Sequence, residues 1–335
     1  MKIRNKITAL MISLIAIPTF AFAQKGKLGL RYWHSEGETE WSHCASTACG
    51  ASAGSILTFG GVTYTSYGDP TSKLNYSGTK AGIGEIFGTY EINKISLMAK
   101  YGTEIRDNDG GKFRDQDWFK SPTTGNNVEF SDTLSDTRNT KVNYYTADLG
   151  MLYDANITGT KITPFLGYVR YKEKLSAYGA VYQPDDISYS SGNASISNST
   201  LVLQNDITWT GFRIGADVDY PVNKEFSFNL NAAYVFGLDA DNKDSHVLRT
   251  SNSDLGPAPN IKNVGNGDYG YMIDVLGQYK YSPQLAFDFG YRWWMFDTDS
   301  GNTKFGPTFN AANTWPNRSL KSERSGLLIG ANYSF

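Results

Sequence analysis

The chain ends with ERSGLLIGANYSF, residues 323–335, and this stretch decides the fold class. Leu327, Ile329, Ala331, Tyr333 and Phe335 occupy every second position, so an extended backbone places them on one face. Small or polar residues fill most positions between them, although Leu328 does not follow the pattern. This alternation predicts a strand with one face in lipid and the other toward a polar interior, as in a transmembrane β-barrel.

A final strand that ends in phenylalanine also resembles the assembly signal of bacterial outer-membrane barrels, and the rest of the chain fits this interpretation. Long alternating segments recur, separated in strict alternation by short turns and long polar loops. We therefore predict an all-β fold, a ten-stranded antiparallel transmembrane β-barrel with long extracellular loops, because an even strand number closes without an edge. The predicted strands are residues 27–35, 72–91, 95–105, 140–154, 161–179, 204–220, 225–241, 268–281, 285–299 and 323–335, with short turns at 93–94, 156–160, 221–224 and 282–284.

The first 23 residues do not belong to this pattern. Lys2, Arg4 and Lys6 precede an apolar stretch at 10–22, and the sequence Ala-Phe-Ala at 21–23 suits a cleavage site. We predict a signal peptide at 1–23 and a barrel at 24–335. A retained helical anchor is the alternative, but a spanning helix needs about 20 apolar residues.

Composition narrows the class further. The net charge of -2 argues against a nucleic-acid partner. A mean hydropathy of -0.40 with 14% aromatic residues fits a barrel or a secreted soluble β-sandwich. Tyr291, Trp293 and Trp294 suit an aromatic girdle at the membrane interface, which favours the barrel.

Two cysteines, Cys44 and Cys49, lie close together in a polar stretch. An exported protein meets an oxidising compartment, so a local disulfide is expected. The spacing has no second pair to complete a zinc site, and we predict no metal.

Two short motifs carry residues that could perform chemistry. Asp244-Ser245-His246 follows the predicted strand 225–241, and Asp115-Gln116-Asp117-Trp118 follows the strand 95–105. Residues two apart in an extended chain point the same way, so Asp244 could orient the imidazole of His246. Two close carboxylates repel, so one of Asp115 and Asp117 should hold a proton unusually tightly. Each motif alone is a weak signal, since Asp-x-Asp in a polar loop is usually a solvated turn.

Together the two motifs resemble the omptins, outer-membrane endopeptidases with an Asp-Gln-Asp-Trp segment and an Asp-x-His segment on a ten-strand barrel. The resemblance runs from about residue 72 to the end of the chain. It implies a water held between the Asp115/Asp117 couple and His246, with His246 as general base and Asp244 orienting it. It also implies a peptide or protein substrate, an active site facing outward from the outer membrane, and no cofactor. We expect a monomer.

The resemblance implies further binding residues, and here the sequence departs from the family. Omptins that cut between basic residues carry acidic pocket residues, for which Glu40 (or Glu38) on the first loop is a candidate. The second position is Asn242, beside Lys243, so preference for basic substrates should weaken. Lipopolysaccharide is expected as an activator and membrane partner, held on the outer wall near Tyr168 and Lys172.

Other functions stay open on the same scaffold. A non-enzymatic adhesin or binding barrel is the first, because one fold can be kept while its activity is lost. A passive pore is disfavoured, because diffusion porins use about 16–18 strands. A lipid-modifying barrel hydrolase would usually show a Ser-His pair, and the sequence offers no convincing second histidine site.

Overall fold

The computed structural model describes residues 25–45, 50, 52–107, 110–155, 157, 159–188, 193–251, 255–306 and 314–335. The predicted signal peptide at 1–23 lies outside the described residues and stays a prediction. No helix in the described part of the chain is long and apolar enough to cross a membrane.

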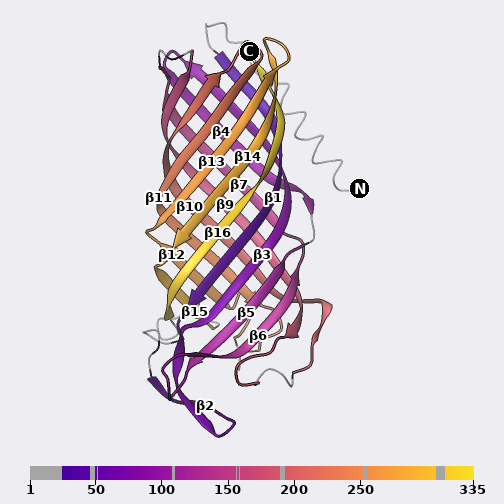
Figure 1. The fold of residues 1–335 in the computed structure, drawn as a ribbon, viewed down its shortest axis with the longest axis vertical. Coiled ribbons are helices and arrows are strands. Elements are labelled where there is room, and N and C mark those ends of the chain that lie inside the picture. Colours follow the sequence, from indigo (N-terminus) through magenta and orange to yellow (C-terminus); the bar gives the residue numbers. More distant parts are fainter. Residues whose placement is uncertain are drawn as a thin grey trace.

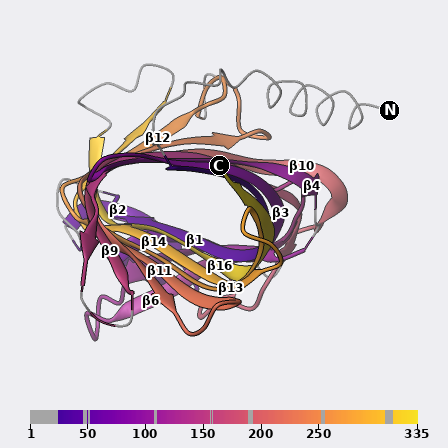
Figure 2. The same cartoon turned by 90° about the horizontal axis from the view of Figure 1, so that it is seen from above.

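Within the described residues, ten long strands close a ring through antiparallel pairing of neighbours (Figure 1). Figure 2 looks along the axis and shows the strands following an oval outline. The predicted all-β, antiparallel barrel is thereby confirmed. In ring order the strands are β1 (Lys25–His43), β3 (Val62–Ile92), β4 (Ile95–Asp107), β7 (Lys141–Met151), β9 (Lys161–Tyr182), β10 (Ile196–Pro221), β11 (Phe226–His246), β13 (Tyr269–Lys280), β14 (Leu285–Thr298) and β16 (Thr314–Ser334).

Tight connections, the start of β1 and the C-terminal residue Phe335 lie at one end of the ring, which we call the turn end. Asn93 begins the β3–β4 turn with φ of 56°, a left-handed conformation that asparagine tolerates. Gly26 and Phe335 exchange two backbone hydrogen bonds of 2.9 Å where β1 meets β16. The opposite end, which we call the loop end, carries the longer connections (Figure 1).

The sheet of the barrel continues beyond the ten-stranded ring toward the loop end. There β5 and β6 bridge β3 to β9, while β12 and β15 bridge β11 to β16. A hairpin of β2 and β3 projects beyond them. The additional strands are β2 (Ser52–Phe59), β5 (Lys112–Lys120), β6 (Asn127–Thr137), β8 (Tyr153–Asp154), β12 (Ile261–Asn266) and β15 (Gly301–Phe305).

These strands correct the predicted loops. Residues 106–139 contain β5 and β6, 242–267 contains the end of β11 and β12, and 300–322 contains β15 and the start of β16. Beyond the belt the outer face of the wall meets water instead of lipid, so the strands there lack the apolar outer face on which the prediction relied.

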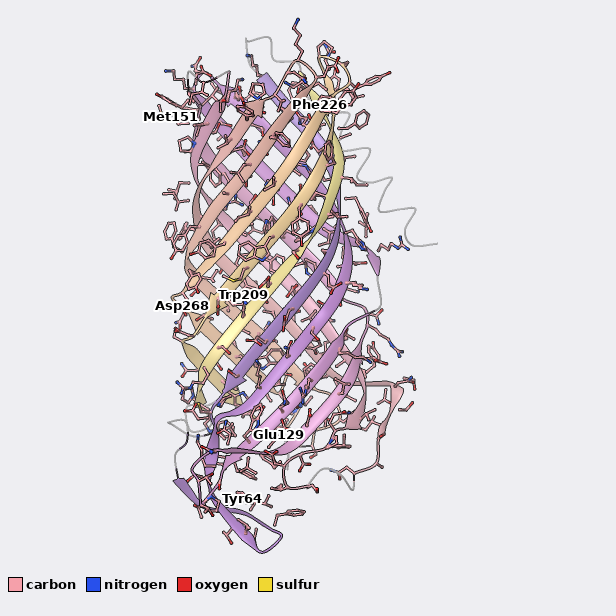
Figure 3. All side chains as sticks on the ribbon, viewed as in Figure 1. Tyr64, Glu129, Met151, Trp209, Phe226 and Asp268 are labelled. Atoms are coloured by element: carbon pink, nitrogen blue, oxygen red, sulfur yellow. The ribbon has the colours of Figure 1, made fainter. Side chains whose placement is uncertain are left out.

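Exposed apolar side chains form a belt around the turn-end half of the barrel. On β16, Leu327 and Ile329 are 62% and 59% exposed. Figure 3 labels Met151 and Phe226 at the turn end and Trp209 and Asp268 about halfway along the barrel, and the belt lies between these two levels. Such a surface is unfavourable in water and suits the hydrocarbon of a bilayer. Other exposed members include Leu97, Leu149, Leu166, Ile214, Phe228, Val275 and Phe289.

The interior at the belt level is filled by ion pairs and aromatic rings, which we call the waist. Arg292 donates to Asp274 at 2.7 and 2.8 Å and to Glu85 at 2.8 Å. Trp33 and Trp294 pack beside it, with ring centroids 5.4 Å apart. Charged groups are accommodated here because each meets an opposite charge.

We expect Ile329→Arg to cost about 2–4 kcal/mol of folding free energy, because it places a charge on the lipid face of the belt. Urea unfolding in lipid vesicles measures it. Glu36→Arg is the control, since Glu36 is exposed on the outer wall of β1 beyond the belt. Equal losses in both variants would show that the belt does not lie in the bilayer.

Candidate active site

The Asp115/Asp117 couple lies on β5, near the loop end. β5 pairs with β3 so that Leu74 stands opposite Asp115 and Ser72 opposite Asp117. Ser72 also hydrogen-bonds the Asp117 carboxylate. The extended backbone of β5 therefore turns both carboxylates to the same inner face, as the sequence predicts for residues two apart.

The second pair lies at the end of β11. Asp244 is buried at 1% exposure, and its Oδ2 lies 3.6 Å from Nε2 of His246. The Asn260 side chain holds the histidine backbone, accepting from the His246 N–H at 2.9 Å and donating to its carbonyl at 3.1 Å. β11 extends five residues beyond the predicted strand end at 241, and this extension carries the pair.

The two pairs meet across the interior. The charge of His246 acts on both Asp115 and Asp117, and that of Asp244 acts on Asp115. Two segments more than a hundred residues apart in sequence are thus brought together at one site.

Burial and mutual repulsion set the protonation of the site. Burial, and then the charge of Asp117, raise the pKa of Asp115 to about 8, while burial raises that of Asp117 to about 6. Burial lowers the pKa of His246, but Asp244 and Asp115 outweigh it, so the net pKa is raised above 6.5. Near pH 7 the carboxylate couple therefore retains one proton.

Several buried polar atoms of this site lack a hydrogen-bond partner within the described part of the protein. They include Asp115 Oδ1, Asp244 Oδ1 and His246 Nε2. A buried unsatisfied polar atom costs about 1–3 kcal/mol, so such atoms seldom gather without a reason. Here they are two carboxylate oxygens and one imidazole nitrogen of groups whose charges act on one another, a set suited to holding a water or a polar group of a ligand.

A neutral layer lies beneath the charged groups. Asn242 is fully buried, and its Oδ1 accepts a 3.1 Å hydrogen bond from Asn205. Tyr76 donates to Asn205 at 2.9 Å. The predicted pocket residue Asn242 therefore faces the interior two positions before Asp244, with neutral neighbours.

A second histidine enters the site that sequence reasoning missed. His43 is buried on β1, its ring 5.3 Å from that of Phe305 and 6.1 Å from that of Trp315. Burial, followed by the charge of His246, lowers its pKa to about 4, so it is neutral near pH 7. The alternation of Thr39, Trp41 and His43 on the inner face of β1 is the signal that could have found it.

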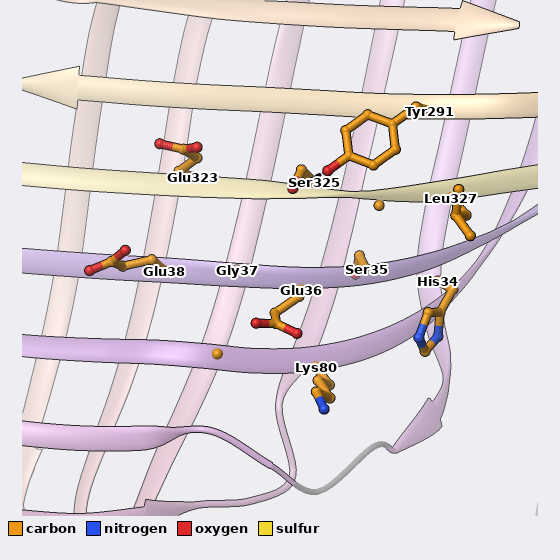
Figure 4. Close-up of a pocket in the computed structure, with 12 residues that line it drawn as sticks. His34, Ser35, Glu36, Gly37, Glu38, Lys80, Tyr291, Glu323, Ser325 and Leu327 are labelled. Atoms are coloured by element: carbon orange, nitrogen blue, oxygen red, sulfur yellow. Dashed lines mark hydrogen bonds between the residues drawn. The ribbon is translucent and has the colours of Figure 1, made fainter.

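Glu40, predicted to bind substrate, does not join the site. It alternates with the buried Thr39 and Trp41 and faces outward, where Lys73 pairs with it at 2.9 Å. Glu38, the other candidate, lines a shallow outer-wall cavity of about 450 Å³ together with Leu327 of the belt (Figure 4). The prediction of Glu40 is therefore wrong in its geometry, because the strand's alternation turns both glutamates away from the interior.

The predicted lipopolysaccharide residues lie on the outer wall. Tyr168 packs against Tyr145 and Phe212, with ring centroids 6.1 and 6.0 Å apart. Lys172, four residues along β9 on the same face, pairs with Asp206 at 2.7 Å. The two residues follow one another from the belt toward the loop end.

Of the two predicted disulfide partners, Cys44 directly follows β1 and is disulfide-bonded. Cys49 lies outside the described residues. The bond places a covalent constraint next to His43, at the loop end of β1.

An antiparallel barrel with an apolar outer belt and a polar site at one end defines a class, the outer-membrane β-barrels. A family model described as Pom, Protochlamydia outer membrane protein, matches residues 85–321. That range is more than half of the chain and includes both the Asp115/Asp117 couple and the Asp244–His246 pair. The chain belongs to the Protochlamydia outer membrane protein family, which also supports the predicted outer-membrane location.

A solved structure gives a likeness in fold. The outer membrane protease OmpT from Escherichia coli superimposes with a TM-score of 0.71 at 14% identity, over 96% of this chain and 99% of that one. Neisserial surface protein A gives 0.24 at 12% identity, over 92% and 97%, and Ail of Yersinia pestis gives 0.27 at 10%, over 94% and 100%. No curated protein matches the sequence.

Proposed function

We propose that this protein is an omptin-type endopeptidase whose active site faces outward from the outer membrane. The observation that carries the proposal is the meeting of Asp115 and Asp117 with the Asp244–His246 pair at the loop end. A protonated carboxyl, an ionised carboxylate and an oriented imidazole around one point are the groups that water activation requires.

In the proposed reaction His246 removes a proton from a water held beside the Asp115/Asp117 couple. The water oxygen attacks the peptide carbonyl carbon, and the carboxyl that retains a proton donates a hydrogen bond to the developing oxyanion. His246 then passes its proton to the leaving amine as the C–N bond breaks. Asp244 stabilises the charged imidazolium between these steps.

Lipopolysaccharide is the proposed activator. Tyr168 and Lys172 stand on one face of β9 where the belt ends, at the level expected for a lipid head group. The carboxylate of Asp206 already pairs with Lys172 and neutralises part of the positive charge that would bind the lipid. A bound lipid would therefore have to displace this carboxylate or bridge it.

A random peptide library offered to the protein, refolded with lipopolysaccharide, tests the proposal. We expect cleavage by the parent, loss of cleavage in Asp115→Asn, and normal cleavage in Asp154→Asn. Asp154 is a matched control because it is exposed at the turn end. Cleavage that survives Asp115→Asn, or a parent that cuts no peptide, would refute the proposed reaction.

The proposed reaction also predicts a bell-shaped dependence of kcat/KM on pH. Activity should rise as His246 loses its proton, at a pH above 6.5 because its pKa is raised. It should fall again near pH 8, where Asp115 loses its proton. In Asp244→Asn the acidic limb should move to lower pH, because the charge that raises the His246 pKa is gone. A flat profile, or an unmoved limb in the variant, contradicts these roles.

A non-enzymatic binding function is the second candidate, favoured by the β2–β3 hairpin. Residues 52–67 contain no charged side chain, and the hairpin projects beyond the rest of the loop end (Figure 1). Binding to cells or matrix proteins that persists in Asp115→Asn, from a parent without peptidase activity, would favour this function.

A further inference from the structure

Two aromatic rings at the loop end have no part in the proposed reaction. Phe305 on β15 and Trp315 on β16 pack with ring centroids 4.3 Å apart, and both side chains keep part of their surface exposed. The ring of His43 on β1 lies 5.3 Å from that of Phe305 and 6.1 Å from that of Trp315. We call these three side chains, together with the buried Ile261 of β12, the aromatic patch.

The register of the strands places the patch on the inner face of the barrel. Thr303 of β15 and Asn263 of β12 are fully buried, and the Thr303 hydroxyl donates to the Asn263 amide oxygen at 2.6 Å. Phe305 lies two residues after Thr303 on the same strand, so its side chain points the same way. Trp315 stands directly opposite Thr303, and residues opposite one another on paired strands share a face.

The same register joins the patch to the Asp244–His246 pair. Asp244 stands opposite Ile261, and Ile261 stands opposite Phe305. The three residues therefore form one row across β11, β12 and β15, in which neighbouring Cβ atoms are about 4.5–5.5 Å apart. The patch begins beside the carboxylate that orients His246.

Asn260 connects the two parts through hydrogen bonds. Its side chain holds the His246 backbone at 2.9 and 3.1 Å, and its carbonyl oxygen accepts from the Gly306 N–H at 3.2 Å. Gly306 directly follows Phe305. A peptide whose scissile bond lies at His246 would thus have the patch next to one of the two side chains that flank the bond.

His43 gives the patch a polar atom without a partner. Its side chain is 6% exposed, and its Nδ1 has no hydrogen-bond partner in the part of the chain that the structure describes. The N–H of the next residue, Cys44, donates to the Pro316 carbonyl at 3.1 Å, which holds His43 against the start of β16. A buried polar atom left unsatisfied is unfavourable, and a ligand at the patch could satisfy it.

We infer that the aromatic patch is a specificity pocket, which takes an aromatic side chain of the substrate on one side of the bond to be cut. This inference rests on the proposed function and names the substrate class for it. Phe305 and Trp315 are half-exposed, so a third ring laid on them removes apolar surface of both partners from water. Stacked and edge-to-face ring pairs add a further attraction, whereas a small side chain would leave both rings in water.

A random peptide library gives the first test. The lipopolysaccharide-bound parent cuts the library, and mass spectrometry identifies the residues on each side of every cut bond. We expect phenylalanine, tyrosine and tryptophan to be enriched on one side. Cleavage without aromatic enrichment on either side would overturn the inference and leave the peptidase standing.

Three peptides with Phe, Leu or Ala at the enriched position give the size of the effect. We expect kcat/KM to be highest for the Phe peptide and lowest for the Ala peptide. The two should differ by about tenfold or more, the ratio that about 1.4 kcal/mol produces. If the parent cuts the Ala peptide as fast as the Phe peptide, the inference is again overturned and the peptidase stands.

Variants assign the preference to the patch. Trp315→Ala should cut the Phe peptide about as slowly as the Ala peptide, and it should cut the Ala peptide at the parent's rate because Asn260 still holds His246. Trp315→Phe should keep most of the preference. Tyr178→Ala is the matched control and should keep all of it, because Tyr178 stands on the outer wall of β9 between the buried Ala177 and Gly179.

A second variant covers loss of folding. If Trp315→Ala cuts no peptide, Phe305→Leu decides the question, because leucine keeps much of the bulk and removes the ring. A smaller ratio of the Phe to the Leu peptide supports the inference, and an unchanged ratio overturns it. If the parent cuts none of the three peptides and nothing in the library, both proposals are overturned.

Discussion

Replacing His246 with alanine is expected to lower kcat/KM for peptide cleavage by about 10²–10⁴-fold, the contribution that a positioned general base makes. Asn260 holds the backbone of His246 through two hydrogen bonds, and alanine preserves both. The loss should therefore appear in the rate while the barrel stays folded. Initial rates with a peptide from the library, together with a circular dichroism spectrum, measure the two properties.

His34→Ala is the matched control for this experiment. His34 is exposed and lines the outer-wall cavity away from the site (Figure 4), so its removal should leave the rate within about twofold, an effect below 0.5 kcal/mol. Equal rates for His246→Ala and the parent would exclude His246 as the base.

The second large effect concerns stability. Arg292→Ala is expected to destabilise the barrel by about 3–5 kcal/mol, because it leaves Glu85 and Asp274 without their main counter-charge in the buried waist. Both carboxylates bond Arg292 at 2.7–2.8 Å, and all three side chains are almost fully enclosed. The midpoint and slope of urea unfolding in vesicles give the free energy.

Arg318→Ala provides the comparison. Arg318 also bonds a carboxylate, Asp69 at 2.8 Å, but its side chain is 52% exposed. Water and salt screen such a pair, so its loss should cost about 0–1 kcal/mol. Losses of similar size in the two variants would mean that the waist is hydrated and its ion pairs contribute little.

Within the apolar belt the sequence predicts the fold closely. The strand predicted at 95–105 is β4 at Ile95–Asp107, and that predicted at 268–281 is β13 at Tyr269–Lys280. Lipid on one side and a polar interior on the other impose a contrast between alternate residues. Past the belt that contrast ends, which is why β5, β6, β12 and β15 were not predicted.

The candidate site was predicted where its residues lie close together in sequence. Asp115 with Asp117, and Asp244 with His246, form pairs within single strands, so extended geometry alone aligns them. His43 joins through contacts between distant strands, which a local pattern does not contain. Glu40 was misplaced because the phase of β1 decides which of its residues face inward.

The packed waist prevents a peptide from passing through the barrel from one end to the other. Trp33, Trp294 and Arg292 are at most 2% exposed, so the barrel is closed at the waist. If the protein is the proposed peptidase, a peptide that reaches Asp115 and His246 enters through the loop end, and its fragments leave by the same route. A site that is open at one end only admits a flexible segment or an unfolded terminus. Folded proteins should therefore be cut in their flexible termini and not in their folded cores.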